Sequence, residues 1–191
     1  MQKEKTLDAI KLPFSFDAEK LQADLKNLRL NDFIYYNVIQ LRSPAYMIDP
    51  SIPVPTDVAD YADGTWTDWL DSPELDNAPY FKEVINYFKE KATVNLIRIL
   101  RLEPGATVKE HTDPTLGIHI WKSMIRLTIP IRRGPDVQFI LNGNQVPMKE
   151  GECWYMNLTK PHSVINGGDM ERINLTIDII PNEWIRSLIN A

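Results

Sequence analysis

Cysteine and a leader-like N-terminus are what this sequence most clearly lacks. The 191 residues include a single cysteine, Cys153, which cannot form a disulfide within the chain and which we expect to be a buried small hydrophobe. Residues 1–5 are polar apart from Met1 and contain none of the apolar stretch of a secretion signal. Both absences favour the reducing cytoplasm as the location of the protein.

Long apolar runs and clusters of basic charge are missing as well. Nowhere do about 18 apolar residues follow one another without a charge, so we expect neither a membrane-spanning helix nor a membrane partner. The formal net charge is −5 at pH 7, and no basic cluster offsets it. We therefore expect no nucleic-acid partner, because binding to phosphate backbones depends on concentrated positive charge. Small molecules remain as the expected class of partner.

The composition that is present is typical of a folded globular protein. Hydrophobic residues make up 43% of the chain and charged residues 25%, which excludes disorder, a collagen repeat and a coiled coil. A chain of 191 residues is long enough for a substantial core, and its length favours one domain, residues 1–191, over a tandem array.

Residues 17–30 have the pattern of an amphipathic helix. Leucines recur at i, i+4 and i+7, and Asp17 stands where its side chain would cap the first turn. The leucine stripe, which we expect in the core, consists of Leu21, Leu25 and Leu28. Residues 33–41 follow with aromatic and β-branched side chains and predict a largely buried strand.

A proline-rich excursion separates this strand from a second helix. Between residues 43 and 79 prolines recur often enough to prevent regular elements, and a long loop of this kind often covers a site. Pro79 then opens a helix that extends to about Glu90, because proline costs no hydrogen bond at the first helical position. Three apolar residues share one face of this helix and are expected to pack inward: Val84, Ile85 and Phe88.

The second half of the chain is rich in short β-type runs that alternate with turn signals. The expected strands are residues 94–102, 124–131, 136–141, 152–158 and 172–180. Their spacing is typical of an antiparallel sandwich or barrel, so the predicted fold class is mainly β with flanking helices, built on a jelly-roll core. We divide the domain into a mixed α/β flank with the excursion (1–92), the jelly-roll core (93–181) and a closing C-terminal helix (182–191).

The chain contains three histidines, so any imidazole chemistry must use His111, His119 or His162. His111 and Asp113 form an H-x-D pair, and in an extended backbone residues i and i+2 project from the same face. One imidazole and one carboxylate side by side can bind one metal ion at the rim of a strand, where other coordination positions stay open. A surface hydrogen-bonded pair is the simpler interpretation of H-x-D alone.

His162 strengthens the metal hypothesis. It follows Pro161 and precedes the turn at residues 166–168, so we expect it to start a strand that runs back beside a partner beginning near Met170. Two histidines and one carboxylate on one side of a metal ion form the facial triad of non-haem Fe(II) oxygenases. Zinc hydrolysis is a rival, and a buried histidine satisfied by hydrogen bonds is the alternative that needs no metal.

Arg172 adds an anion-binding group if the turn has the right length. A three-residue loop at residues 166–168 would pair His162 with Arg172 on one face of a hairpin. A two-residue loop would pair Arg172 with Ser163 and turn the arginine to the opposite face. In the first register the guanidinium could hold a dicarboxylate such as 2-oxoglutarate near the metal.

Three segments resemble a known family. They are LRLEPGATVKEHTDPT (100–115), MIRLTIPI (124–131) and GECWYMNLTKPHSVINGGDMERINLTID (151–178), and the resemblance extends over about residues 93–181. It is to the aspartyl/asparaginyl β-hydroxylase superfamily, and more closely to small bacterial members that act on free amino acids, such as the proline hydroxylases. It implies a double-stranded β-helix, or jelly roll, of the cupin type that binds Fe(II) and 2-oxoglutarate. Such an enzyme uses O2 to hydroxylate an unactivated C–H bond, with succinate and CO2 as products.

Carried over by position, the resemblance implies roles for single residues. His111, Asp113 and His162 correspond to the metal ligands, and Arg172 corresponds to the arginine that grips the far carboxylate of 2-oxoglutarate. Arg126 resembles a second arginine that contacts the co-substrate or a substrate carboxylate. Mammalian-type members lack the ligand carboxylate, whereas Asp113 completes the triad here. No side chain is expected to act as a general acid or base.

Three further residues are candidates for substrate contact. Trp66 and Trp69 could wall a substrate pocket, although aromatic residues at i and i+3 are more often core. We expect His119 to be structural or to face the substrate.

These observations predict an Fe(II)/2-oxoglutarate-dependent dioxygenase that hydroxylates a small substrate, a free or carrier-bound amino acid. One alternative is a non-catalytic cupin-like module that binds a metal or a carboxylate. A second is a hydroxylase of Asp or Asn side chains in proteins. A metal hydrolase ranks last, because the sequence has no H-E-x-x-H arrangement to activate water.

Overall fold

The computed structural model describes residues 8–28, 38–56 and 63–189. The predicted strand at 33–41 lies partly outside these ranges, and its described end belongs to a strand that begins at Val38. The last residues of the predicted helix at 17–30 and of the predicted closing helix at 182–191 also lie outside them.

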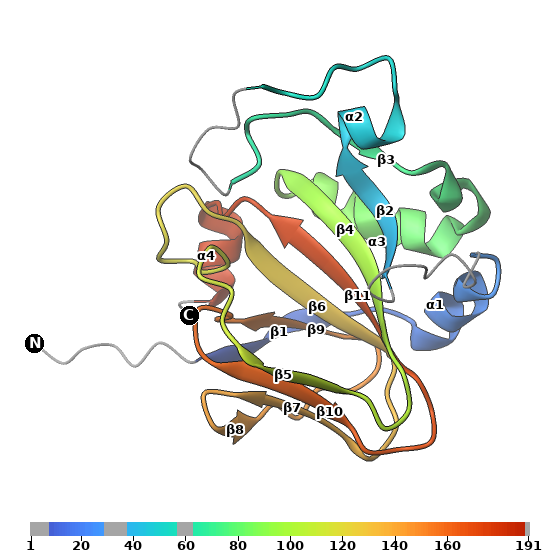
Figure 1. Cartoon of the computed structure of the whole chain (residues 1–191), viewed down its shortest axis with the longest axis vertical. Coiled ribbons are helices and arrows are strands. Elements are labelled where there is room, and N and C mark those ends of the chain that lie inside the picture. Colours follow the sequence, from blue (N-terminus) through green and yellow to red (C-terminus); the bar gives the residue numbers. More distant parts are fainter. Residues whose placement is uncertain (1–7, 29–37, 57–62, 190–191) are drawn as a thin grey trace, which may run out of the picture.

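Two antiparallel sheets form the framework of the described chain (Figure 1). The larger sheet has the strand order β1 (Ala9–Ser15), β9 (Glu152–Met156), β6 (Ile125–Arg132), β11 (Arg172–Ile179), β4 (Val94–Leu102), β2 (Val38–Pro44) and β3 (Trp69–Asp71). The smaller sheet has the order β5 (Thr107–His111), β10 (His162–Asn166), β7 (Val137–Leu141) and β8 (Asn144–Gln145). From β4 to β11 the chain passes back and forth between the two sheets, apart from the β7–β8 pair within the smaller one, and this arrangement is a jelly roll. The predicted fold class is confirmed.

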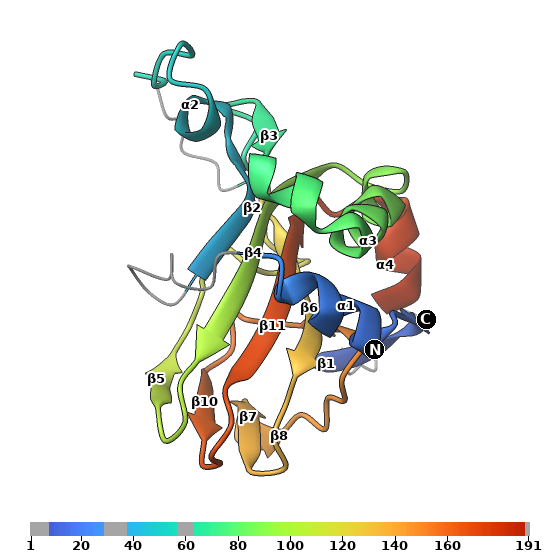
Figure 2. The same cartoon turned by 90° about the vertical axis from the view of Figure 1, so that its right-hand side faces the viewer.

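Helices cover one face of the larger sheet (Figure 2). They are α1 (Ala18–Leu25), α3 (Pro79–Lys89) and α4 (Glu183–Ile189), and each lies where the sequence predicts a helix. Asp17 caps α1 as expected, because its Oδ1 accepts hydrogen bonds from the backbone N–H groups of Glu19 and Lys20 at 3.0 and 3.1 Å. No helix of the described residues is long and apolar enough to cross a membrane.

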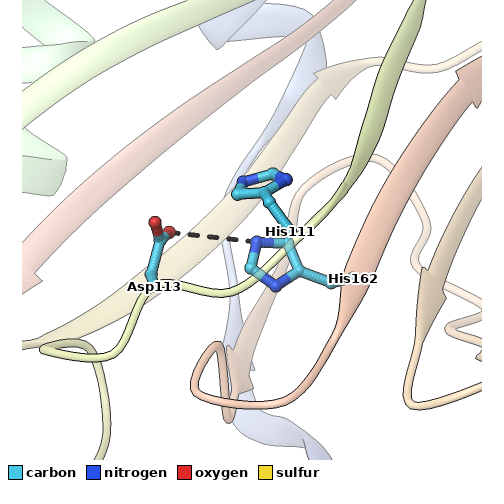
Figure 3. A group of neighbouring side chains, drawn as sticks. All are labelled: His111, Asp113 and His162. Atoms are coloured by element: carbon cyan, nitrogen blue, oxygen red, sulfur yellow. Dashed lines mark ion pairs between the residues drawn. The ribbon is translucent and has the colours of Figure 1, made fainter.

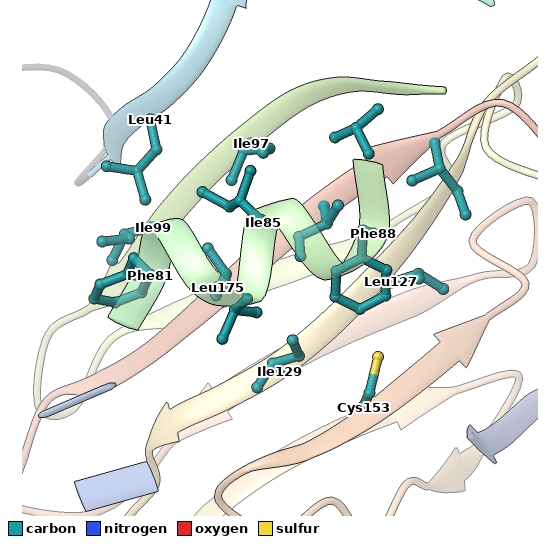
Figure 4. Packing of buried hydrophobic residues seen from close by; sticks show 14 of the residues in the cluster. Leu41, Phe81, Ile85, Phe88, Ile97, Ile99, Leu127, Ile129, Cys153 and Leu175 are labelled. Carbon is teal, nitrogen blue, oxygen red and sulfur yellow. The ribbon is translucent and has the colours of Figure 1, made fainter. Parts of the chain in front are cut away.

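The main hydrophobic core lies between these helices and the larger sheet (Figure 4). The inward face of α3 packs over aliphatic residues of β4, β6 and β11, among them Ile97, Ile99, Leu127, Ile129 and Leu175. Val84, Ile85 and Phe88 are buried as the sequence predicts. Cys153 is also buried here, and burial raises the pKa of its thiol, so this cysteine is an unreactive hydrophobe as expected.

Strand β11 is buried on both faces and separates two environments. Its residues alternate strictly, since successive side chains of a strand point to opposite sides. Ile173, Leu175, Ile177 and Ile179 belong to the core beneath the helices. Arg172, Asn174, Thr176 and Asp178 point the other way, toward the smaller sheet, and the first three line a cavity there. The polar half of β11 therefore provides one wall of the space between the sheets.

The predicted hairpin between the strands at His162 and Arg172 is wrong. β10 pairs with β5 and β7 in the smaller sheet, whereas β11 pairs with β4 and β6 in the larger sheet. Residues 167–171 cross from one sheet to the other, so neither proposed loop register applies. The residue types of a turn indicate only that the chain reverses direction. They do not determine whether the next strand pairs with the previous strand or joins the opposite sheet.

The proline-rich excursion and the first strand also differ from the sequence-based expectation. β2 ends at Pro44, and the excursion contains the short helix α2 (Ala45–Ile48), β3 and a 3-10 helix, η2 (Pro73–Asn77), so prolines limit the length of its elements without abolishing them. β1 was not predicted because Pro13 interrupts its apolar pattern. This strand lies at a sheet edge, where a residue without a backbone N–H is tolerated. The division at residues 92 and 181 stays a prediction.

Candidate metal centre

His111 and Asp113 lie where β5 ends. His111 is the last residue of the strand, and Asp113 follows two residues later. The backbone of Asp113 is held on both sides: its N–H donates to the carbonyl oxygen of Leu158 at 2.9 Å, and its carbonyl oxygen accepts from the N–H of Leu116 at 3.0 Å. Two hydrogen bonds therefore fix the backbone from which this carboxylate projects.

His162 is the first residue of β10 and lies directly opposite His111 in the β5–β10 ladder. The centroids of the two imidazole rings are 4.3 Å apart. His162 is buried, with 4% of its surface exposed, whereas His111 is exposed. Cross-strand pairing thus brings together two histidines that are far apart in the sequence.

Backbone hydrogen bonds orient both imidazole rings. Nδ1 of His111 is 2.8 Å from the carbonyl oxygen of Lys109, and Nδ1 of His162 is 3.0 Å from that of Lys160. A carbonyl oxygen can only accept, so each Nδ1 carries a proton, and in the neutral form of either ring Nε2 would have the lone pair that binds a metal. Burial lowers the pKa of His162 despite the opposing effect of its backbone hydrogen bond, so its ring is held in the neutral form that metals bind.

The side chains of His111, Asp113 and His162 form one cluster (Figure 3). Each offers one ligand atom, and these atoms lie within 4.8 Å of one another. Nε2 of His162 is 3.8 Å from Oδ2 of Asp113. Two atoms bound to one ion at about 2.1 Å each are at most about 4.2 Å apart, so this pair can share a metal without backbone movement. Donor types and tautomers fit a divalent metal with imidazole and carboxylate ligands, and the three ligand atoms, which lie within 4.8 Å of one another, would have to approach to within about 4.2 Å to bind one ion together.

Arg126 is held by Asp178 and faces Asp113. Its Nε and Nη2 donate to the two carboxylate oxygens of Asp178, each at 2.7 Å, while Nη1 lies 3.7 Å from Oδ2 of Asp113. Burial lowers the pKa of Arg126, but the charges of Asp178 and Asp113 together with the Asp178 hydrogen bond raise it overall. Asp178 uses two of the five N–H donors of this guanidinium, and the contact to Asp113 is an ion pair longer than a hydrogen bond. The observed contacts therefore neutralise Arg126 and place its charge beside a candidate metal ligand.

A cavity of about 200 Å³ extends from the metal cluster into the space between the sheets. Arg126, Thr128 and Thr176 contribute polar groups from the larger sheet, and Phe139 and Val164 contribute apolar groups from the smaller one. A larger hollow of about 580 Å³ lies beside α3 and contains none of the predicted site residues. The chemistry-bearing residues are therefore gathered at the smaller, interior space.

Arg172 lines the same cavity from β11. Its guanidinium carbon lies 6.0 Å from the ring centroid of Phe139, and that ring stacks on His162 with centroids 6.0 Å apart. Burial, together with the charge of Arg133, lowers the pKa of Arg172 to about 10. No carboxylate of the described chain forms an ion pair with it. The predicted interior position of Arg172 is correct even though the hairpin from which it was inferred does not exist.

Asn174 supplies a hydrogen bond to Arg172. With the Asn174 amide in the orientation that satisfies both of its polar atoms, its oxygen accepts from Nη1 of Arg172 at 3.0 Å, and its nitrogen donates to the carbonyl oxygen of Ile173 at 3.1 Å. A neutral amide does not compensate the guanidinium charge. The site therefore contains a buried cation that an anionic ligand would neutralise.

Arg98 was not anticipated from the sequence. It lies opposite Thr176 in the β4–β11 ladder and so shares the inner face of the sheet. Its Nε is buried without a hydrogen-bond partner. Burial and the charge of Arg126 lower its pKa, while Asp178 and Asp113 act in the opposite direction. The available signal was a charged residue at the centre of a mostly aliphatic strand.

The three candidate substrate contacts lie elsewhere in the described structure. His119 is exposed in the segment after Asp113, and it does not line the cavity. Trp66 and Trp69 pack edge to face, with centroids 6.3 Å apart, and Nε1 of Trp69 donates to the carbonyl oxygen of Gly64 at 2.9 Å. These contacts belong to the excursion beside β2 and β3, so the two tryptophans do not line the metal-site cavity.

Comparison with known proteins adds a family match. The model of the family described as aspartyl/asparaginyl beta-hydroxylase matches residues 65–181, which is more than half of the chain. The match begins within the excursion and ends just after β11. It therefore contains the metal cluster, Arg98 and Arg172.

Solved structures share the fold at low sequence identity. An oxidoreductase of the 2OG-Fe(II) oxygenase family from Burkholderia pseudomallei is 15% identical, with a TM-score of 0.53 over 90% of this chain and 83% of that chain. A non-heme monooxygenase, ThoJ in its apo form, is 12% identical, with a TM-score of 0.54 over 92% of this chain and 74% of that chain. These likenesses extend over nearly the whole chain and identify its fold as that of such oxygenases.

Proposed function

The chain belongs to the aspartyl/asparaginyl beta-hydroxylase family, and from this premise we propose that it is an Fe(II)- and 2-oxoglutarate-dependent dioxygenase that hydroxylates a small substrate, a free or carrier-bound amino acid. The observation that carries the proposal is the convergence of two histidines and one carboxylate at a cavity that also contains the buried, uncompensated Arg172. The fold shared with a 2OG-Fe(II) oxygenase family protein supports the same assignment.

His111, Asp113 and His162 would hold the iron through two Nε2 atoms and one carboxylate oxygen. When bound, Fe(II) and 2-oxoglutarate together supply the chemistry that inserts one atom of O2 into a C–H bond, with succinate and CO2 as the other products. Three protein ligands leave positions for other ligands, as in a facial triad. Apolar residues of the cavity wall, among them Phe139, Leu158 and Val164, would exclude water from the reacting groups.

Arg172 would bind the far carboxylate of 2-oxoglutarate. Its guanidinium is buried, it forms no ion pair with a carboxylate of the described residues, and the Phe139 ring is 6.0 Å from both its guanidinium carbon and the His162 ring. A carboxylate at this position would neutralise the charge and form a bidentate, charge-assisted pair, which the neutral Asn174 oxygen that accepts from Nη1 and Nη2 cannot provide.

Arg98 would bind the carboxylate of an amino-acid substrate. Arg98 lies on the inner face of the larger sheet near the charges of Arg126, Asp178 and Asp113. Its ladder partner is Thr176, and Arg172 lies four residues before Thr176 along β11. Arg98, whose Nε has no hydrogen-bond partner, and Arg172, which forms no ion pair among the described residues, thus lie at different points along the inner face of the larger sheet. Two anionic groups, one of the co-substrate and one of the substrate, match this distribution of charge.

The test is an anaerobic titration of the protein with Fe(II) and 2-oxoglutarate, followed by a mass-spectrometric screen of amino acids for the gain of one oxygen atom. We expect a weak visible absorption band and stoichiometric succinate formation. His111→Ala and Asp113→Ala should abolish the band, because each removes one ligand of the cluster. His119→Ala is the matched control and should keep it, because this histidine lies outside the cavity.

Two results would count against the proposal. A wild-type protein that forms no band and no succinate with any amino acid would leave a non-catalytic binding module as the better account. Oxygen gain in Asp or Asn side chains of peptides, with none in free amino acids, would redirect the substrate assignment to proteins.

A further inference from the structure

The metal cluster and Arg172 belong to opposite walls of the cavity. His162 lies in the smaller sheet and Arg172 in the larger one, and no ladder joins β10 to β11. The distance between the two groups is therefore not set by strand pairing, as it would be in a hairpin. Some other contact must connect the end of β10 to the beginning of β11.

Asn166, the last residue of β10, makes that connection with its side chain. Its surface is 0% exposed. Its Nδ2 donates to the carbonyl oxygens of Leu102 at 3.1 Å, Glu103 at 3.0 Å and Met170 at 2.8 Å, and its Oδ1 accepts from the N–H of Gly168 at 3.3 Å. One side chain thus ties the end of β4 and the crossing segment to the smaller sheet.

The backbone of Asn166 is equally constrained. Its N–H donates to the carbonyl oxygen of Ala106 at 3.0 Å, and its own carbonyl oxygen accepts from the N–H of Gly105 at 2.8 Å. The neighbouring Gly167 donates to the carbonyl oxygen of Asp136 at 3.1 Å, just before β7. Asn166 is therefore fixed within the smaller sheet. Its side-chain hydrogen bonds hold the end of β4 and the crossing segment at a defined place relative to that sheet.

Two of the three carbonyl acceptors adjoin Arg172. Leu102 is the ladder partner of Arg172 in the β4–β11 pair, and Met170 precedes Arg172 by two residues. On the other side, Asn166 is four residues from His162 along one strand, which is about 13 Å at about 3.3 Å per residue. A change at Asn166 would therefore move Arg172 relative to the metal ligands while leaving each sheet intact.

We propose that Asn166 is a positioning residue that sets the separation between the metal ligands and Arg172, and thereby the length of the 2-oxo dicarboxylic acid that the cavity accepts. The proposal rests on the proposed function, because it assumes that the metal and Arg172 hold opposite ends of one co-substrate. The geometry favours this residue over Asn174, because Asn174 contacts Arg172 within the same strand and cannot relate the two sheets.

Co-substrate binding and length selectivity test the proposal. Titrations of the Mn²⁺-loaded protein by calorimetry give the dissociation constants of 2-oxoglutarate and of 2-oxoadipate, which is one methylene longer. We expect Asn166→Ala to weaken 2-oxoglutarate binding about tenfold and to reduce the preference for 2-oxoglutarate over 2-oxoadipate. Mn²⁺ affinity should change less than twofold, because His111, Asp113 and His162 are untouched.

A matched control separates positioning from general loss of stability. Asn182→Ala removes two of the same kinds of side-chain hydrogen bond, since Nδ2 of Asn182 donates to the carbonyl oxygen of Lys91 at 2.7 Å and its Oδ1 accepts from the N–H of Ile185 at 3.2 Å. This residue precedes α4, and it does not line the cavity. We expect Asn182→Ala to keep wild-type 2-oxo acid affinities. Asn166→Ser, which keeps one donor, provides a milder variant if Asn166→Ala does not fold, and it should show a smaller shift in the same direction.

The outcomes distinguish this proposal from the function on which it rests. If the wild-type protein binds 2-oxoglutarate and the Asn166 variants lose stability with unchanged affinity and unchanged length preference, Asn166 is a structural residue and the proposal is overturned. If the Mn²⁺-loaded wild-type protein binds neither 2-oxo acid, the proposed function itself fails, and the positioning role fails with it.

Discussion

Two buried arginines in the space between the sheets differ in how their charge is balanced. Arg126 is bound by both oxygens of Asp178, whereas Arg172 has a neutral amide and an aromatic ring beside it. A paired guanidinium is already neutralised in the ligand-free protein, whereas an unpaired buried one favours an anionic ligand. The same residue type therefore has a structural role at one position and a proposed binding role at the other.

Asp178→Asn should destabilise the metal-free protein strongly. The substitution leaves Arg126 buried without its main counter-ion, so we expect the free energy of unfolding to fall by about 3–5 kcal/mol in urea denaturation. Asp76→Asn is the control, because the Asp76–Lys82 ion pair is exposed and should contribute no more than about 1 kcal/mol. Equal stabilities of Asp178→Asn and wild type would contradict the structural role of the Arg126–Asp178 pair.

Arg172→Lys should weaken 2-oxoglutarate binding although it keeps the positive charge. Lysine lacks the planar fork that binds a carboxylate bidentately, and a hydrogen bond to a charged group contributes about 1.5–3 kcal/mol. We therefore expect the dissociation constant to rise about ten- to a hundredfold in the anaerobic titration. Metal affinity should stay at the wild-type value. Unchanged 2-oxoglutarate binding would remove Arg172 from the proposed co-substrate site.

Strand β11 shows how one element serves the core and the cavity together. Its aliphatic residues pack under the helices, and its polar residues face the smaller sheet. Strict alternation permits this because the side-chain period of a strand is two residues. Substitutions on its two faces should therefore have separable effects on stability and on ligand binding.

Leu175→Ala should lower stability without changing the metal site. The side chain is fully buried against α3, so its truncation creates a cavity that costs about 2–5 kcal/mol. Chemical denaturation would measure that loss, and Mn²⁺ titration of the folded variant should give the wild-type affinity. A large loss of Mn²⁺ affinity in this variant would show that the two faces of β11 are not independent.

Asp71 links β3 to β2 and α3 and should make their association pH dependent. Its carboxylate accepts from Nη1 of Arg42 at 2.6 Å and also pairs with Lys89. Burial raises the pKa of Asp71, but the hydrogen bonds and charges of Lys89 and Arg42 lower it overall, below the ordinary value of 3.8. Because the folded pKa is depressed, the carboxylate contributes stability above pH 3.8, and the contribution is lost as pH falls through the folded pKa.

The difference between wild type and Asp71→Asn should follow this pH dependence. We expect wild type to be more stable near neutral pH and the difference in unfolding free energy to shrink as pH falls below about 3.8. The difference should be modest because the side chain is partly exposed to solvent. Urea denaturation at a series of pH values measures it, and a difference that grows toward low pH would reverse the inferred sign.

The two sheets meet around the candidate site, so ligands that join them should stabilise the whole molecule. Mn²⁺ and 2-oxoglutarate that bind only the folded state should add about 2.7 kcal/mol at a hundredfold excess over the dissociation constant. Thermal denaturation should therefore give a higher midpoint with both ligands present. His162→Ala should abolish the metal-dependent shift. An identical shift in that variant would mean that the metal binds elsewhere.

Much of the fold was predictable from the sequence because it depends on local patterns. The caps and apolar stripes predicted α1 and α3, and dense β-branched runs predicted β4, β6, β7, β9 and β11. β1 was missed because Pro13 resembles a break until the strand is seen at an edge. Pairing between β10 and β11 was predicted wrongly because the choice between a hairpin and a crossing depends on distant strands.

The candidate site, like the fold, was predictable from the sequence only in part. The sequence by itself determined which residue types were available for metal and anion binding, since H-x-D spacing, His162 and Arg172 are local features of the chain. Only the tertiary structure decided that His162 lies opposite His111, that Arg172 enters the cavity from the larger sheet, and that Asp178 forms an ion pair with Arg126. The physical reason is that strand pairing and the compensation of buried charge depend on contacts between residues far apart in the chain, and the free energy of those contacts has no local signature.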